Sequence, residues 1–140
     1  MGVAKSTRGN QKAERPLSPH LQIWRWTPTM AASIAHRTTG IGLYAGTFAL
    51  AVFVFAAARS PALFATIGDF LGSPFGLLIL FGYAFALVFH TLNGLRHLYW
   101  DMGRGLDLKS ATLTAWLSFA AAAIAAVVII AAALAARGGA

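Results

Sequence analysis

The chain has 140 residues, of which 58% are hydrophobic and only 11% are charged, and its formal net charge is +7. Soluble domains usually carry about 25% charged residues, and a soluble fold of this size cannot hide so much apolar surface. The chain contains no cysteine, which excludes disulfides, thiolate metal sites and covalent c-type haem attachment. The composition therefore predicts a membrane protein.

Three long stretches contain no Asp, Glu, Lys or Arg, and they cover residues 38–58, 70–95 and 110–136. Each exceeds the roughly 20 residues that an α-helix needs to cross the hydrocarbon core. Only helices and closed barrels satisfy every backbone group in lipid, and the stretches lack the polar–apolar alternation of barrel strands. The predicted fold is an all-α membrane protein whose three transmembrane helices form an up-down-up bundle.

Residues that typically start or break helices indicate where the predicted spans begin and end. Thr27 followed by Pro28 is typical of a helix start, whereas Pro74 either starts the second helix proper or kinks its first turns. The predicted spans cover about 28–58, 70–98 and 110–136. The predicted organisation is an arm over 1–27, a transmembrane domain over 28–136 and a tail over 137–140.

The basic residues predict the orientation in the membrane. Nine of the eleven would lie on one side, namely Lys5, Arg8, Lys12, Arg15, Arg25, Arg37, Arg96, Arg104 and Lys109. Only Arg59 and Arg137 would lie on the other side. The positive-inside rule then places the N-terminus in the cytoplasm. This asymmetry also accounts for the basic arm, so we expect no nucleic-acid partner.

Polar residues form two clusters at the edges of the apolar stretches. The first contains Ser33, His36 and Arg37, where Ser33 and Arg37 lie four apart on one helical face. The second contains His90, Asn93, Gly94, His97 and Asp101, of which positions 90, 94, 97 and 101 recur at helical spacing and form one stripe. Ionisable groups at membrane depth are costly and indicate function by default. Both clusters lie toward the predicted cytoplasmic side, where they can meet at one depth.

Each of these residues also has a plainer interpretation. Arg37, Arg96 and Arg104 can be topology charges at helix ends, and His97 with Asp101 can be a solvated pair one turn apart. His90 can be a buried neutral histidine with one hydrogen bond. A neutral imidazole in an apolar slot is also what haem iron takes as an axial ligand. We interpret the glycines Gly42 and Gly46 as a helix-packing pair.

Three motifs resemble one known family. They are RPLSPHLQIW (15–24), SIAHRTTG (33–40) and HTLNGLRHLYWDMG (90–103). In order and in register with the helices, they resemble the cytochrome b membrane-anchor subunit of succinate dehydrogenase. The resemblance implies three partners: a flavoprotein that oxidises succinate, an iron–sulfur subunit that carries the electrons, and a second membrane anchor. The succinate site would then lie in another subunit, so we expect no catalytic residue for it in this chain.

The resemblance also implies roles for individual residues. His90 would be an axial ligand of haem b, with the other ligand supplied by the second anchor. The haem-propionate residues would be His36, Arg37 and His97. Ser33 and Arg37 would border the quinone pocket, with Asp101 nearby, and the quinone would be ubiquinone or menaquinone. Reducing a quinone places negative charge on its carbonyl oxygens, which a hydroxyl and a fixed cation can stabilise.

Three other functions stay open at this level: a haem-free structural anchor, a fumarate reductase anchor, and a small transporter with His90 and Arg37 on an ion path. Transporters usually show paired repeats with broken helices, which the three unlike apolar stretches do not. The predicted location is the bacterial cytoplasmic (inner) membrane, favoured over the mitochondrial inner membrane.

Overall fold

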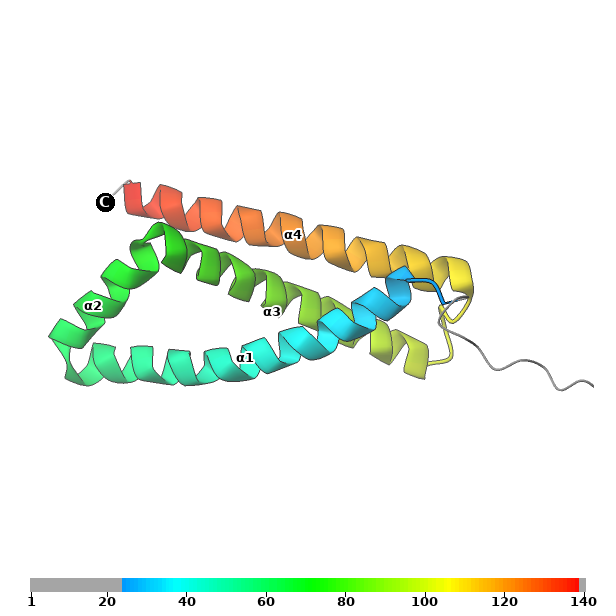
Figure 1. Ribbon diagram of the computed structural model, residues 1–140, viewed down its shortest axis with the longest axis horizontal. Helices are drawn as coiled ribbons and strands as arrows, with labels where there is room; N and C mark the ends of the chain where they lie inside the picture. Colours follow the sequence, from blue (N-terminus) through cyan, green and yellow to red (C-terminus); the bar gives the residue numbers. More distant parts are fainter. Residues whose placement is uncertain (1–23, 139–140) are drawn as a thin grey trace, which may run out of the picture.

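The computed structural model describes residues 24–138, and this part of the chain is helical without any strand. Its elements are α1 (Pro28–Arg59), α2 (Pro61–Gly72), α3 (Pro74–Asp101) and α4 (Leu108–Gly138). The three long helices run in alternating directions, and α2 joins α1 to α3 at one end (Figure 1). α1, α3 and α4 are each long and apolar enough to cross a membrane. The all-α, three-span prediction is therefore confirmed, whereas the side of the membrane that faces the N-terminus stays a prediction.

Three of the helices start at the same two-residue pattern, a hydroxyl residue followed by proline. α1, α2 and α3 each begin with proline after a capping hydroxyl residue, namely Thr27, Ser60 and Ser73. Each hydroxyl accepts a hydrogen bond from the amide three residues later, at 3.3, 3.4 and 3.1 Å. Proline suits the first helical position because its missing N–H would have no partner there. Of the two roles considered for Pro74, the structure shows that it starts α3.

The segment between the first two spans differs from the sequence prediction. It contains the short helix α2, which was not predicted, and the second long helix begins at Pro74 rather than at residue 70. The charge-free stretch that begins at residue 70 joins the end of one helix to the start of the next, and hydropathy does not separate them. The predicted arm up to residue 23, with most of the motif at 15–24, lies outside the described residues, as do residues 139–140.

The core of the bundle is thin and lies between α3 and its two long neighbours. Phe89 of α3 is fully buried, and its ring lies 4.6 Å from that of Phe119 on α4. α4 presents small buried side chains along one stripe, namely Ala115, Ser118, Ala122 and Ala126. Lipid tails are as apolar as side chains, so membrane helices associate through close packing, for which small residues are suited.

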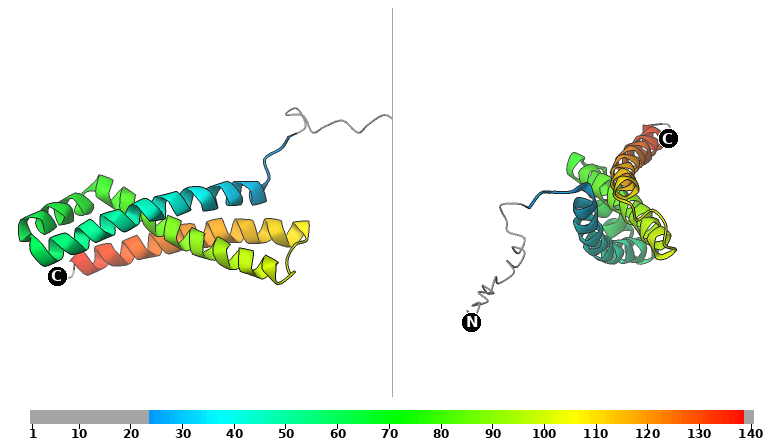
Figure 2. Two further views of the ribbon diagram at one scale, coloured as in Figure 1. Left: turned by 90° about the horizontal axis from the view of Figure 1, so that it is seen from below. Right: turned by 90° about the vertical axis from the view of Figure 1, so that its right-hand side faces the viewer.

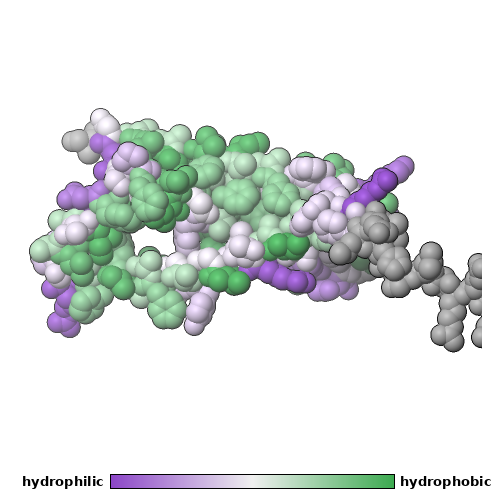
Figure 3. Space-filling view, viewed as in Figure 1, coloured by the Kyte–Doolittle hydropathy of each residue, from purple (hydrophilic) through white to green (hydrophobic). Residues whose placement is uncertain are grey.

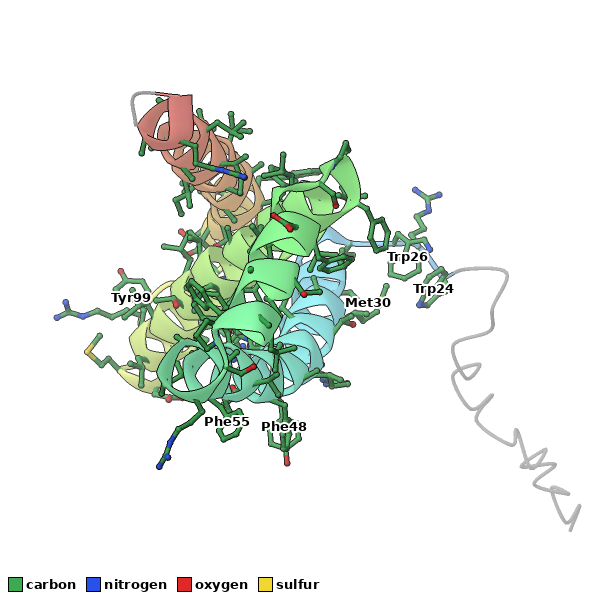
Figure 4. All side chains as sticks on the ribbon, turned by 90° about the vertical axis from the view of Figure 1, so that its left-hand side faces the viewer. Trp24, Trp26, Met30, Phe48, Phe55 and Tyr99 are labelled. Atoms are coloured by element: carbon green, nitrogen blue, oxygen red, sulfur yellow. The ribbon has the colours of Figure 1, made fainter. Side chains whose placement is uncertain are left out.

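Most large apolar side chains point away from this core. Ile41 and Leu108, for example, are 73% and 78% exposed, and Figure 4 shows Phe48 and Phe55 directed outward from α1. The face of the bundle seen in Figure 3 is predominantly hydrophobic. Such a surface is suited to lipid or to other apolar helices. The chain is an integral membrane protein.

Of the glycine pair interpreted as a packing signal, only one member mediates a helix contact. A Cβ atom at Gly46 would overlap the ring of Tyr83 on α3, whereas nothing lies within 4 Å of the same point at Gly42. α1 and α3 therefore approach each other through Gly46. The views in Figure 2 place α2 at the end of the bundle opposite to the start of α1, so the polar residues near the start of α1 are far from α2.

Candidate functional site

The structure brings together three histidines from the two polar clusters. The imidazole of His36 on α1 stacks on that of His90 on α3, with ring centroids 3.9 Å apart and an interplanar angle of 13°. The ring of His97, two turns further along α3, lies 5.4 Å from that of His36. We call His36, His90 and His97 the histidine cluster. The two sequence clusters, 54 residues apart in the chain, thus meet between α1 and α3.

Hydrogen bonding determines which nitrogen of His90 carries a proton. Nδ1 lies 3.1 Å from the backbone carbonyl oxygen of His36 and 3.3 Å from the hydroxyl of Thr39. A carbonyl oxygen can only accept, so Nδ1 is the protonated nitrogen and donates. In the neutral imidazole, Nε2 is then the nitrogen that carries the lone pair. A backbone carbonyl on one ring nitrogen is the usual device that prepares the other nitrogen to bind a metal.

Gly40 provides the space for this imidazole. A Cβ atom at Gly40 would lie 3.0 Å from Cε1 of His90, closer than side chains normally approach. Any residue larger than glycine would therefore press on the ring. Thr39 and Gly40 were not named as site residues from the sequence, although they stand one turn after His36, at the spacing that shares its helix face.

His36 contributes a second feature to the cluster. Its Nδ1 atom is buried and has no hydrogen-bond partner among residues 24–138. Buried polar side-chain atoms are nearly always paired, so an unpaired nitrogen at this position is unusual and distinguishes the cluster from an ordinary helix contact.

The opposite face of α3 holds a different polar group. Arg96 is only 7% exposed and lies against α4. Its Nε donates to the Thr114 hydroxyl at 3.0 Å, and its Nη2 donates to the Ala111 carbonyl at 2.8 Å. Its Nη1 donates to the side-chain oxygen of Asn93 at 3.4 Å. The interpretation of Arg96 as a topology charge at a helix end does not account for its burial against α4.

The other predicted site residues lie at the surface of this chain. Ser33 is half-buried, and Arg37 and Asp101 are exposed. None of the three takes part in the stacking of the histidine rings. A pocket that includes them needs walls from lipid or from another polypeptide.

The chemistry of the cluster suits one kind of ligand. Within residues 24–138, no group of three or more His, Cys, Asp or Glu side chains is placed to hold a metal ion. A single imidazole with a free Nε2 can nevertheless complete the coordination of a metal that is already held by an organic macrocycle. The fold and the site thus define an integral membrane protein with a histidine cluster between two of its spanning helices.

Comparison with known families identifies this class more closely. Residues 11–129 match the family described as succinate dehydrogenase/fumarate reductase transmembrane subunit. The match covers well over half of the chain, and the chain belongs to this family. The family resemblance drawn from the three motifs is confirmed.

The relatives include mitochondrial and bacterial proteins. The chain is 42% identical over 108 residues to the mitochondrial succinate dehydrogenase cytochrome b560 subunit of Sus scrofa, a match that covers 74% of this chain and 62% of the pig protein. It is 42% identical over 109 residues to the succinate dehydrogenase cytochrome b556 subunit of Paracoccus denitrificans, covering 78% and 81% of the two chains. A cytochrome b556 subunit of Rickettsia felis is 31% identical over 103 residues, covering 74% and 80%.

Proposed function

We propose that this chain is a cytochrome b anchor subunit of succinate dehydrogenase. In this role it would hold haem b together with a second anchor subunit and form part of the site where quinone is reduced. Electrons would come from succinate oxidation in a flavoprotein, through an iron–sulfur subunit. The names of the relatives support the assignment, and the observation that carries it is His90, whose Nδ1 is held by a carbonyl and whose Nε2 is free.

The residues of the cluster fit haem b. When bound, the haem iron supplies a centre that takes up and releases one electron. His90 would provide one axial nitrogen, which a neutral Nε2 can do. The imidazoles of His36 and His97 would hold the propionates, with Arg37 as a charged partner. The second axial histidine would come from the other anchor subunit.

Quinone would bind where α1 begins. Ser33 would donate a hydrogen bond to a quinone carbonyl, and Arg37 would stabilise the negative charge that develops there. His97 and Asp101, at the end of α3, would pass protons from the aqueous side. Because Ser33 is half-buried and Arg37 and Asp101 are exposed, the neighbouring subunits would complete the pocket and exclude water from it.

An optical spectrum of the assembled complex tests the haem assignment. His90→Leu removes the axial nitrogen without adding charge, so the reduced-minus-oxidised b-type signal should fall to the level of membranes that lack this chain. Thr91→Leu is the matched control, because it adds the same side chain at the next, exposed position and should retain the signal. An unchanged low-spin spectrum in the His90→Leu complex would exclude His90 as the ligand. A complex that lacks the signal even without mutation would favour a haem-free anchor.

The proposed location is the bacterial cytoplasmic membrane, with the N-terminus on the cytoplasmic side. The nine-to-two split of basic residues supports this orientation. Reporter fusions after Lys109 should therefore report the cytoplasm, and fusions after Arg137 the outer side. The opposite result at either position would move the histidine cluster to the other side of the membrane.

A further inference from the structure

Arg96 is a buried cation whose hydrogen-bond partners among residues 24–138 are all neutral. Its three hydrogen bonds go to the Thr114 hydroxyl, the Ala111 carbonyl and the Asn93 amide oxygen. The Thr114 hydroxyl donates its own proton to the Ser110 carbonyl at 2.8 Å, so it is fixed as an acceptor toward Arg96. A buried charge is costly unless several partners compensate it. These partners, two of them on α4, fix the guanidinium plane in one place.

The guanidinium in turn supports Trp100. Its Cζ atom lies 4.0 Å from the centroid of the Trp100 ring, within the range of a cation–π interaction. The indole Nε1 donates to the Gly105 carbonyl at 3.0 Å. Gly105 has a φ of +69°, and a Cβ atom there would lie 2.6 Å from the Tyr99 ring, so glycine is required at this turn. The ring of Trp100 is therefore held over one face by Arg96 and at its Nε1 edge by the loop before α4.

Trp100 extends this arrangement to the histidine cluster. Its ring meets that of His97 edge to face, with centroids 5.3 Å apart and an interplanar angle of 83°. His97 then lies 5.4 Å from His36, which stacks on His90. A continuous series of contacts thus runs from α4 through Arg96 and Trp100 to the three histidines. It joins the two faces of α3, which otherwise pack against different helices.

We propose that Arg96 is a positioning residue: through Trp100 it holds His97 in place at the histidine cluster, without touching a ligand itself. This inference rests on the proposed function, because it assumes that the cluster binds haem and borders the quinone site. A residue that only joins α3 to α4 would change how much complex assembles. A positioning residue changes the properties of each assembled complex.

The test uses the assembled complex in membranes and measures the quinone KM and kcat, the haem reduction potential and the activity with an artificial acceptor. Arg96→Lys keeps the charge but loses the planar fork that binds Thr114 and Ala111 together. We expect the quinone KM to rise roughly three- to tenfold, the size of a typical coupling between contacting residues. The haem potential should shift, while acceptor-linked activity should not change. Arg104→Lys makes the same change at an exposed arginine and should leave all four values unchanged.

A double-mutant cycle decides whether Arg96 acts through Trp100. Trp100→Leu alone should raise the quinone KM, and adding Arg96→Lys to it should cause no further change. Arg96 is not a positioning residue if the fold increases in quinone KM of the two single variants multiply in the double variant. The same conclusion follows if Arg96→Lys lowers only the amount of assembled complex. If Arg96→Lys does not assemble, Trp100→Phe takes its place, because it keeps a ring but loses the bond to Gly105; an unchanged KM there would refute the proposal.

The same measurements separate this inference from the proposed function. An unmutated complex with neither haem b nor quinone reduction would refute the proposed function, and the inference with it. An unmutated complex with both properties, combined with independent effects of Arg96→Lys and Trp100→Leu, would refute the inference alone.

Discussion

Both faces of α3 carry polar side chains, but these side chains differ in how completely they are hydrogen-bonded within the chain. Toward α4, Asn93 and Arg96 are buried, and every hydrogen bond described for the Arg96 guanidinium ends on a protein acceptor. Toward α1, His90 has one nitrogen bonded and the other free, and His36 has a buried nitrogen without a partner among the described residues. In lipid, both kinds of polar group are costly. We call the face toward α4, where each guanidinium nitrogen of Arg96 has a hydrogen-bond partner, the saturated face. We call the face toward α1, where Nδ1 of His36 has no partner among the described residues, the unsaturated face.

The largest expected effect comes from filling the space on the unsaturated face. Gly40→Leu would place a bulky side chain against the His90 ring, because even a Cβ atom lies 3.0 Å from Cε1. The ring would have to move, and the haem b signal of the assembled complex should be largely lost. Gly42→Leu is the matched control, since it makes the same change on the same helix at a point with nothing within 4 Å. Equal haem content in the two variants would show that haem binding does not depend on the space that Gly40 leaves for the His90 imidazole.

A smaller effect is expected from a donor at the edge of the same face. Ser33→Ala removes one hydroxyl, and losing one such donor in a water-poor site typically costs about 10²–10³ in rate. Ser33 is half-buried in this chain, so we expect a decrease toward the lower end of that range in quinone reduction. The haem signal and the acceptor-linked activity should be retained. Quinone-linked and acceptor-linked activities that both stay at the unmutated level would remove Ser33 from the quinone site.

The smallest effect is expected from Asp107, which lies just before α4 and outside the span. Asp107 supports the saturated face indirectly, through the first turn of α4. The Asp107 carboxylate accepts a hydrogen bond from the Ser110 amide at 2.9 Å, and this backbone hydrogen bond, together with one to the Ser110 side chain, lowers the pKa of Asp107. Asp107 thereby caps the turn that carries Ala111, an acceptor of Arg96. Asp107→Ala should lower the thermal stability of the complex slightly, whereas Asp107→Asn, which can also cap, should lower it less.

The lowered pKa fixes the sign of the pH dependence of this cap. A carboxyl group whose pKa is lower in the folded state stabilises that state above its unfolded pKa. The contribution is lost as the pH falls through the folded pKa. The stability difference between Asp107 and Asp107→Ala should therefore be largest at neutral pH and become smaller in acid, which thermal unfolding across pH can measure. A difference that stays undiminished in acid would show that the carboxylate charge is not the cause.

The sequence by itself determined that there are three spans and where α1 starts, because these depend on local properties. A long charge-free stretch without polar–apolar alternation is helical in lipid, and a hydroxyl residue before proline, such as Thr27 before Pro28, favours a helix start. The helical spacing of His90 and His97 placed both on one face of α3, and the motif at 33–40 marked His36 as a partner. Helix α2 escaped prediction because apolar residues continue across Gly72 and Pro74, so hydropathy shows no boundary there.

Only the tertiary structure decided how the two faces of α3 differ. Sequence gives Arg96 and Arg104 the same charge near the same helix end. In the structure Arg96 lies within α3, on the face that packs against α4, and is buried, whereas Arg104 lies in the loop after α3 and is exposed. The free Nε2 of His90 likewise depends on a carbonyl 54 residues away. Such partners are set by how the helices pack against one another, and helix packing is a property of two surfaces in contact. Neither surface alone carries that information.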